Sequence, residues 1–345
     1  MSRQAGEKKP RIAVLGAGNW GSTVAHMIGA NGYPVSLWCR SEKQREEINT
    51  HHTNTRYLED TRLSQNITAT NDLEEAIVGA PLIFVVIPSK SFREVVRAMG
   101  EVLRPSQFVI HATKGIESRT HLRMSEVLLQ ETCALQFGVL SGPNIALEMC
   151  QGKPAGTVIA SEFPRVIEAG RSALVSEQLR VYANTDVVGV ELGGTLKNVV
   201  AIAAGMLSAL DLGENAKALL ITRGLSEIAR IGVALGADPM TFAGLAGIGD
   251  LMVTCSSPLS RNHRVGAALA KGMKLDEAVE KLGMVAEGVN TAKVVHSIAE
   301  RHRLDVPLLE SVYRALHENL TPAEGIRELM QLSSRYDIDR ALQGH

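Results

Sequence analysis

One short segment decides the fold of this chain: Ile12-Ala13-Val14-Leu15-Gly16-Ala17-Gly18-Asn19-Trp20-Gly21, followed by a helical stretch to Asn31. The first four residues are apolar, as a buried strand requires. The glycines then follow the pattern GxGxxG between a strand and a helix. In this setting Gly16 allows a tight turn, Gly18 lets the backbone approach a pyrophosphate, and Gly21 lets helix and strand pack closely. The segment predicts a dinucleotide-binding strand–turn–helix unit; the alternative is a glycine-rich turn that serves packing alone.

The rest of the first half alternates short apolar runs with helical stretches, such as Ser89–Leu103 and Ser118–Thr132. Strands that alternate with helices predict a parallel, doubly wound sheet. We therefore expect a Rossmann-type, mostly parallel sheet whose further strands are Val35–Cys39, Leu82–Ile87, Phe108–Ala112, Phe137–Leu140, Thr157–Ala160 and Leu179–Ala183.

After Asp186 the pattern changes to apolar stretches of helical length and period. Only short loops around Gly213, Gly244–Gly249 and Ser256–Ser260 interrupt them. This predicts a dinucleotide-binding domain over residues 1–186 and an all-helical substrate and catalytic domain over residues 187–345, with helices at Val187–Leu210, Asn215–Leu235, Arg264–Ala270, Asp276–Leu282, Thr291–His302, Leu308–His317 and Pro322–Leu332.

The composition is that of a soluble protein: 345 residues, 45% hydrophobic and 21% charged, with a formal net charge of −1. This charge gives no general reason to expect nucleic acid or an anionic membrane as a partner. The longest nearly uncharged segment, Asn198–Leu210, is shorter than the roughly 20 residues that a membrane span needs. The cysteines are scattered and no HExxH spacing occurs, so we expect no metal site and no disulfide frame. The expected location is the cytoplasm.

The second predicted strand ends in Arg40, where NAD-specific proteins place an acid for the ribose hydroxyl. A guanidinium at this position suits the 2′-phosphate of NADP. Alternatively, Arg40 stacks on the adenine or is merely solvated. Either NAD(H) or NADP(H) therefore remains open as the cofactor.

Two lysines are candidates for the chemistry. Lys114 follows a predicted strand in a Gly turn, where it would contact an anionic substrate or a carbonyl group, unless it is a simple surface lysine. Lys197 and Glu191 are the only ionisable residues in the apolar stretch from Val187 to Leu210. A helix that is apolar all round is buried, and desolvation lowers the pKa of a lysine towards neutrality. This indicates a general acid and base; the alternative is a buried ion pair between Lys197 and Glu191.

Two later segments carry partners for such a lysine. Asp250 lies in the stretch Gly244–Cys255, which we expect to be a glycine-rich loop with one acid and a threonine, and it could orient the ammonium group of Lys197. Arg261 and Asn262 offer a planar cationic fork and an amide, which suit a phosphate group. Cys255 has no base nearby in the sequence, so we interpret it as a packing thiol.

Taken together, these segments resemble the NAD(P)-dependent glycerol-3-phosphate dehydrogenases over nearly the whole chain. The resemblance rests on the glycine segment and on further motifs in the family's order, namely Ala112-Thr113-Lys114-Gly115, Ser141-Gly142-Pro143-Asn144, Glu191-Leu192-Gly193-Gly194-Thr195-Leu196-Lys197-Asn198, Gly247-Ile248-Gly249-Asp250-Leu251-Met252-Val253-Thr254-Cys255, Ser260-Arg261-Asn262 and Val285-Ala286-Glu287-Gly288.

The resemblance implies reduction of dihydroxyacetone phosphate to sn-glycerol 3-phosphate for phospholipid synthesis, and a homodimer. It implies that Lys197 is the proton donor and acceptor. Substrate contacts would come from Lys114, Gly142, Asn144, Lys197, Asp250, Ser260, Arg261 and Asn262. The cofactor would be lined by Gly16, Gly18, Asn19, Trp20, Gly21, Arg40, Lys114, Ala146, Arg261, Val285 and Glu287. Bacterial members usually carry Ser or Thr where this chain has Asn144, which makes that contact a departure from the family's pattern.

Two other functions fit parts of the sequence. A 3-hydroxyacid dehydrogenase shares the two-domain plan and also uses a lysine from the helical domain. Activity on 3-hydroxyisobutyrate but not on glycerol 3-phosphate would identify it. A catalytically silent nucleotide sensor would bind the cofactor without turnover. Such a sensor would not need the candidate catalytic and substrate-binding residues, all of which are present in this chain: Lys114, Lys197, Asp250 and Arg261.

Overall fold

The computed structural model describes residues 9–59, 61–258, 260–282 and 286–331. Contacts divide the chain into two compact units. Unit 1 comprises Met1–Thr113, Met124–Leu140 and Asn144–Thr185, and unit 2 comprises Lys114–Arg123, Ser141–Pro143 and Asp186–His345. The division expected from the sequence is contiguous, whereas here two short segments of the first half belong with the helical unit.

Unit 1 is built on one eight-stranded sheet with the order β3-β2-β1-β4-β5-β6-β7-β8. The strand pairs from β3 through to β6 are parallel, as is the pair β7–β8. This confirms the doubly wound, mostly parallel sheet, and the strand order reverses between β1 and β4, where such sheets bind ligands. The strands are β1 (Ile12–Leu15), β2 (Val35–Trp38), β3 (Ile67–Thr70), β4 (Leu82–Val85), β5 (Phe108–His111), β6 (Phe137–Ser141), β7 (Ala155–Ala160) and β8 (Leu179–Asn184).

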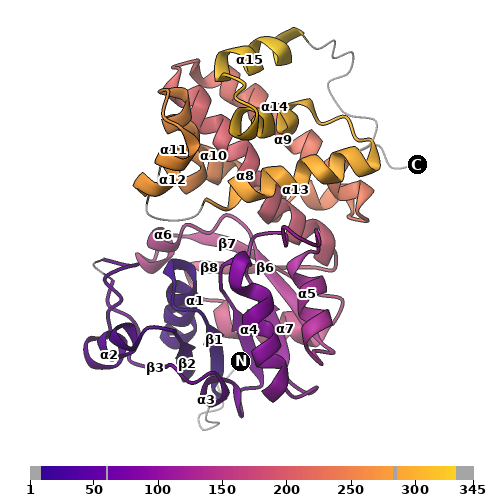
Figure 1. Ribbon diagram of the computed structural model, residues 1–345. Helices are drawn as coiled ribbons and strands as arrows, with labels where there is room; N and C mark the ends of the chain where they lie inside the picture. Colours follow the sequence, from indigo (N-terminus) through magenta and orange to yellow (C-terminus); the bar gives the residue numbers. More distant parts are fainter. Residues whose placement is uncertain (1–8, 60, 259, 283–285, 332–345) are drawn as a thin grey trace. The chain divides into compact units, whose positions relative to one another are not determined.

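Helices cover both faces of this sheet (Figure 1). Helix α4 contacts α3 and α5, while α1 contacts α6 and α7. Strands β1 and β4 are buried along their whole length, as strands covered on both faces must be. The helices of this unit are α1 (Asn19–Ala30), α2 (Glu42–His51), α3 (Leu73–Ile77), α4 (Ser89–Val102), α5 (Met124–Glu131), α6 (Ala146–Cys150) and α7 (Pro164–Leu174).

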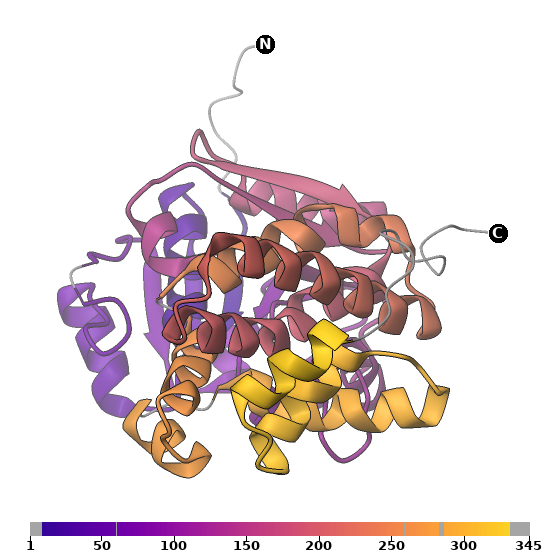
Figure 2. The same cartoon turned by 90° about the horizontal axis from the view of Figure 1, so that it is seen from above.

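In the part of unit 2 that the structure describes, every regular element is helical (Figure 2). Its elements are α8 (Val187–Ala209), α9 (Gly213–Ala234), the 3₁₀ turn η1 (Pro239–Ala243), the π turn η2 (Leu245–Gly249), α10 (Asp250–Ser256), α11 (Arg261–Ala270), α12 (Leu275–Leu282), α13 (Glu287–His302), α14 (Pro307–His317) and α15 (Pro322–Gln331).

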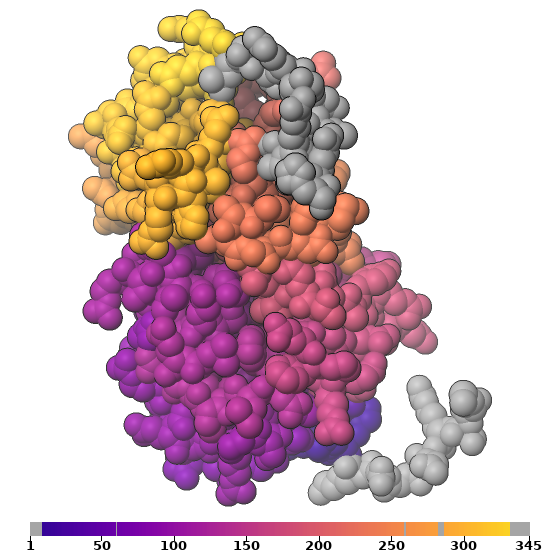
Figure 3. All heavy atoms as spheres, turned by 90° about the vertical axis from the view of Figure 1, so that its right-hand side faces the viewer, coloured from indigo at the N-terminus to yellow at the C-terminus, as the bar shows by residue number. Residues whose placement is uncertain are grey.

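Helix α8 is the centre of unit 2, because it contacts α9, α10, α11, α13 and α14. The orange and yellow atoms of α13 to α15 form one side of this unit in the space-filling view (Figure 3). By length and composition α8 could cross a membrane, but 89% of its apolar window is buried inside the structure. A helix buried among other helices is the core of its unit, which is the interpretation that the sequence favoured for Val187–Leu210.

Besides differences of a few residues at the ends of helices, three local predictions were wrong. Strand β3 was missed, because Ile67-Thr-Ala-Thr70 is short and half polar. The helix expected from Ser118 begins at Met124, because Ile116 and Arg123 form an antiparallel bridge instead. The stretch Gly244–Gly249 was expected to be a loop, but residues 245–249 form a π turn that leads directly into α10.

Candidate active site

The three glycines of the first turn are required for different reasons. Gly16 has φ of +110°, and a Cβ there would lie 2.3 Å from the carbonyl oxygen of Val86. A Cβ on Gly21 would lie 1.8 Å from the carbonyl oxygen of Gly16, so this glycine lets α1 pack on the turn. At Gly18 a Cβ would meet nothing within 4 Å. Gly18 therefore leaves open space beside the turn, which is what the approach of a ligand to the backbone requires.

The start of α1 suits an anion. Gly18 is its N-cap, with no side-chain hydrogen bond, and no acidic residue lies in the first turn that Asn19 and Trp20 begin. The first backbone N–H groups of a helix have no partner within the helix, and together with the helix dipole they bind phosphate. The residues present therefore fit the diphosphate of a dinucleotide.

Arg40 lies just beyond the carboxyl end of β2 and is exposed. Strand β2 is the direct neighbour of β1, and the Trp38 carbonyl accepts a hydrogen bond of 3.0 Å from the N–H of Gly16. The side chain of Ser41 caps α2 by accepting from the N–H of Gln44. Arg40 thus stands on the strand next to the glycine turn, as the sequence predicted.

Asn144 and Ala146 also belong to unit 1, after β6. The side-chain amide of Asn144 donates to Thr157 Oγ1 at 3.0 Å, while its Oδ1 is buried without a hydrogen-bond partner among the described residues. A buried acceptor without a partner is unfavourable until a donor reaches it. Ala146 is the first residue of α6.

In unit 2, Lys197 lies at the centre of a buried polar cluster. Its side chain is 7% exposed, and that of Asp250 is 1% exposed. The ammonium group donates to Asp250 Oδ1 and, at 2.7 Å, to Thr254 Oγ1. The Thr254 hydroxyl in turn donates to the backbone oxygen of Asp250 at 2.7 Å. Asp250 and Thr254 are one helical turn apart on α10, so both face Lys197.

Lys114 belongs to the same cluster, because it contacts the other oxygen of the Asp250 carboxylate. Its ammonium group lies 2.7 Å from Asp250 Oδ2 and 3.2 Å from the carbonyl oxygen of Gly142. Gly142 has φ of +133°, a conformation that favours glycine. The structure therefore brings together four of the predicted residues, Lys114, Gly142, Lys197 and Asp250, from distant parts of the sequence.

The electrostatics of this cluster favour a lysine that exchanges a proton near neutrality. The pKa of Lys197 is lowered to about 7: burial lowers it most, the Asp250 carboxylate opposes the fall, and the positive charge of Lys114 adds to it. Desolvation disfavours the charged form of an amine, and a nearby like charge has the same sign of effect. Proton transfer is most efficient for a group whose pKa is near the working pH.

Two glycines of α8 make this arrangement possible. A Cβ on Gly193 would lie 2.4 Å from the carbonyl oxygen of Ala246, in the π turn. A Cβ on Gly194 would lie 2.4 Å from Ser141 Oγ and 3.6 Å from Lys114 Cε. The π turn and Ser141 therefore approach α8 in space that the Cβ of any other residue would fill, and Lys114 lies beside Ser141. Single π turns inside helical segments are frequent at functional sites.

The alternative of an ion pair between Lys197 and Glu191 does not occur. Glu191 pairs instead with Arg123, at 3.0 Å, and the Glu191 side chain is 1% exposed. Arg123 lies at the end of the short segment that begins with Lys114. This buried ion pair holds that segment on α8.

A second chain of hydrogen bonds in unit 2 links three elements. The Asn262 amide donates to Asn198 Oδ1 at 2.9 Å, and Asn262 Oδ1 accepts from the N–H of Gly288 at 3.1 Å. Asn198 directly follows Lys197 on α8. Asn262 is 7% exposed, so this predicted residue is held in place by buried partners.

The remaining predicted residues of unit 2 lie at helix starts. Ser260 is the N-cap of α11 and accepts from the N–H of His263, while Arg261 is the first residue of that helix and is exposed. Glu287 is the first residue of α13. Val285 lies outside the described residues.

Sequence reasoning did not assign roles to Thr254 or Asn198, although both contact predicted residues. The spacing of Asp250 and Thr254 would have indicated a shared face, had the segment been recognised as helical. Cys255 is fully buried, and burial raises the pKa of its thiol to about 12, which agrees with a packing role.

Comparisons with known proteins agree with this geometry. Residues 11–166 match the family described as NAD-dependent glycerol-3-phosphate dehydrogenase N-terminus, and residues 186–327 match the corresponding C-terminus. A glycerol-3-phosphate dehydrogenase of Macrococcus caseolyticus, named for NAD(P)+, is 42% identical over 323 residues, 93% of this chain and 97% of that protein. One of Pseudomonas fluorescens is 46% identical over 333 residues, 96% of this chain and 94% of that protein.

Among solved structures, the glycerol-3-phosphate dehydrogenase of Coxiella burnetii superimposes with a TM-score of 0.90 at 36% identity. The match covers 94% of this chain and 100% of that chain. Both halves of the sequence, their order and their fold therefore agree with one family. This chain belongs to the NAD-dependent glycerol-3-phosphate dehydrogenase family.

Proposed function

We propose that this chain catalyses the reversible reduction of dihydroxyacetone phosphate to sn-glycerol 3-phosphate with NADH or NADPH. The observation that carries the proposal is the buried Lys197, held between Asp250 and Thr254 and with its pKa lowered to about 7. Relatives over more than nine-tenths of the chain bear the name of this activity. The product supplies glycerophospholipid synthesis.

The nicotinamide cofactor, when bound, supplies the hydride for the carbonyl carbon. Lys197 gives a proton to the carbonyl oxygen in reduction, and its neutral amine takes the hydroxyl proton in oxidation. The Asp250 carboxylate and the Thr254 hydroxyl orient the amine by accepting its hydrogen bonds. The ammonium group also stabilises the negative charge that develops on the carbonyl oxygen.

We assign the substrate contacts to Lys114, Gly142, Asn144, Lys197, Asp250, Ser260, Arg261 and Asn262. An arginine and amides suit a phosphate, because the guanidinium fork binds its oxygens in pairs. We assign the cofactor contacts to Gly16, Gly18, Asn19, Trp20, Gly21, Arg40, Lys114, Ala146, Arg261, Val285 and Glu287. The division that we propose for the chain is a dinucleotide-binding part, residues 1–186, and a helical substrate and catalytic part, residues 187–345. The contacts do not follow this division strictly, because Lys114, Gly142 and Asn144 lie in the first part of the sequence and Arg261, Val285 and Glu287 in the second. We further propose a cytoplasmic homodimer.

Replacement of Lys197 by alanine tests the proposal. Because a positioned proton donor contributes about 10²–10⁴-fold, kcat for dihydroxyacetone phosphate should fall by at least that range. Lys197→Arg should not restore it, since guanidinium scarcely releases its proton. NADH affinity, measured by fluorescence quenching in the same preparations, should change little.

Near-normal turnover in Lys197→Ala would refute the mechanism, and loss of NADH binding would identify a structural lysine instead. Wild-type turnover of 3-hydroxyisobutyrate, with none of dihydroxyacetone phosphate, would replace the substrate assignment with the 3-hydroxyacid alternative.

A further inference from the structure

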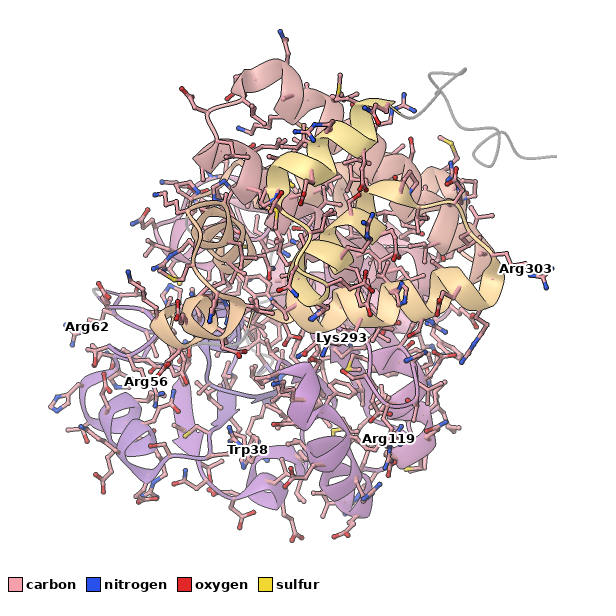
Figure 4. The ribbon with its side chains drawn as sticks, turned by 45° about the horizontal axis from the view of Figure 1, so that its top comes forward. Trp38, Arg56, Arg62, Arg119, Lys293 and Arg303 are labelled. Atoms are coloured by element: carbon pink, nitrogen blue, oxygen red, sulfur yellow. The ribbon has the colours of Figure 1, made fainter. Side chains whose placement is uncertain are left out.

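The segment after α2 contains one polar residue that differs from its polar neighbours. Arg56 and Arg62 are exposed and lie at the surface of unit 1 (Figure 4). Asn54, in contrast, is 0% exposed. A fully buried amide in a polar surface segment must have its hydrogen bonds satisfied inside the protein.

The partners of Asn54 belong to the glycine turn and to the first turn of α1. Its Nδ2 donates to the carbonyl oxygen of Ala17 at 3.0 Å and to Ser22 Oγ at 2.7 Å. Gln44 Nε2 donates to the same Ala17 oxygen at 2.5 Å and to Asn54 Oδ1 at 3.2 Å. Two side-chain amides, which also bond to each other, therefore hold one carbonyl group between Gly16 and Gly18.

The direction of this carbonyl fixes the direction of an N–H group. The Ala17 carbonyl and the Gly18 N–H belong to one planar peptide, and the described residues contain no cis peptide. In a trans peptide the C=O and N–H bonds point in opposite directions. With the carbonyl held towards Asn54 and Gln44, the Gly18 N–H is directed away from them. Gly18 is also the position at which a Cβ would meet nothing within 4 Å.

We infer that Asn54, together with Gln44, is a positioning residue for the cofactor diphosphate. It acts through the peptide between Ala17 and Gly18, which it orients so that the N–H of Gly18 is available to a phosphate oxygen. This inference rests on the dinucleotide-binding role proposed above. Gln44 also lies in the first turn of α2, four residues after Arg40. The same amide pair therefore connects the diphosphate turn with the segment that would read the ribose.

The chain offers a matched control for Asn54. Asn49, on α2, donates to the carbonyl of Ala69 at 2.9 Å and accepts from its N–H at 2.7 Å. Asn49→Ala therefore removes two hydrogen bonds between an asparagine and the backbone in the same unit, without touching the glycine turn.

The experiment compares ADP-ribose with adenosine, which lacks the diphosphate, as competitors of NADH followed by fluorescence. Asn54→Ala should raise the Kd of ADP-ribose by about tenfold, the equivalent of one lost orienting hydrogen bond, and leave that of adenosine unchanged. Gln44→Ala should show a smaller change of the same kind. Asn49→Ala should lower Tm without altering the ratio of the two Kd values.

If Asn54→Ala loses affinity for ADP-ribose and adenosine equally, or for neither, the positioning role is wrong, but the proposal of a dinucleotide site is not affected. If Asn54→Ala does not fold, Gln44→Ala decides the question by the same ratio. If the wild-type protein itself does not bind ADP-ribose, the dinucleotide site and the positioning role fall together.

Discussion

At the scale of single residues, the Asp250 carboxylate is shared by two ammonium groups. Lys114 lies at 2.7 Å from one oxygen, and its charge lowers the pKa of Lys197. Lys197 must be protonated to act as an acid, so the rate of reduction should fall as pH rises through about 7. Lys114→Met removes the like charge, which should raise the pKa of Lys197. The fall of kcat with rising pH, which forms the alkaline limb of the pH profile, should then occur at higher pH.

The measurement is kcat for dihydroxyacetone phosphate at saturating NADH, from pH 5.5 to pH 9.5. The overall rate should also fall, since Lys114 is an assigned substrate contact, but the shift of the limb does not depend on that loss. A limb that stays in place, or moves to lower pH, contradicts the coupling of the two lysines.

Arg40 is exposed at the carboxyl end of β2, on the strand next to the glycine turn. An arginine that reads the 2′-phosphate makes a charge-assisted contact with it, worth about 1.5–3 kcal/mol. Arg40→Ala should therefore raise KM for NADPH roughly tenfold or more, and KM for NADH much less. Steady-state assays with both coenzymes check this, and Lys43→Ala is a control on the same segment. Equal effects of Arg40→Ala on both coenzymes would show that Arg40 does not read the 2′ position.

Some of these residues could be found from the sequence and others could not. Lys197 stands out because it is an ionisable group in an apolar helix, which is a property of one continuous segment. Asn54 does not, because its partners Ala17, Ser22 and Gln44 are defined only by the folded chain. A polar stretch predicts exposed side chains, and no periodicity in the sequence marks Asn54 as a polar residue that is buried.

At the scale of elements, α14 depends on a residue of another helix. Helix α14 begins with Pro307 and has no side-chain cap of its own. Glu227, on α9, is 5% exposed and accepts 2.9 Å hydrogen bonds from the N–H groups of Leu308 and Leu309. Burial nevertheless raises the pKa of Glu227 to about 7, with these two N–H groups opposing the rise.

This shift predicts how stability depends on pH. The carboxyl group of the unfolded chain titrates at about 4.3, below the value in the folded state. The favourable contribution of protonated Glu227 is therefore complete below that pH and is lost as pH rises towards 7. Between pH 4.5 and pH 7.5 the wild-type Tm should fall relative to that of Glu227→Gln, which does not titrate. The difference should reach several degrees, since about 1 kcal/mol moves Tm by roughly 2–4 °C for a domain of this size.

Calorimetry of both proteins across this range, with Glu177→Gln as an exposed control on unit 1, provides the measurement. A Tm difference that is constant with pH would mean that Glu227 is already ionised at pH 4.5.

Most elements could be predicted from the sequence. The exceptions depend on contacts with other segments of the folded chain, which the local sequence does not reveal. The core strands and the long helices carry strong apolar periodicity, which is sufficient by itself. Strand β3 lies at the edge of the sheet, and two of its four residues are polar threonines. Its composition is therefore not that of a buried strand, and its parallel pairing with β2 stabilises it. The late start of α5 depends on the bridge between Ile116 and Arg123, and the ion pair of Arg123 with Glu191 supports it from a residue 68 positions away.

At the scale of the whole molecule, the two compact units are not successive pieces of chain. The backbone passes from one unit to the other five times, because Lys114–Arg123 and Ser141–Pro143 leave unit 1 and return to it. Each unit has its own hydrophobic core. Unfolding of either unit disrupts the segments that belong to the other, so we expect a single cooperative transition.

Differential scanning calorimetry should give a van't Hoff enthalpy that agrees with the calorimetric enthalpy, within the limits of reversible unfolding. Circular dichroism and NADH fluorescence should report the same midpoint. Two resolved transitions would mean that the shared segments do not couple the units.

The adjacent glycines of α8 limit how far this protein can be stabilised by design. Alanine is preferred over glycine in a helix interior by about 1 kcal/mol, so Gly193 and Gly194 would be natural targets for any thermostabilisation scheme that ranks helical residues by propensity. Both Cβ positions are already taken, by the backbone of Ala246 and by Ser141 beside Lys114. Alanine at Gly193 would push the π turn off the helix, and alanine at Gly194 would displace Ser141. Both substitutions should therefore lower the melting temperature, although alanine has the better helix propensity.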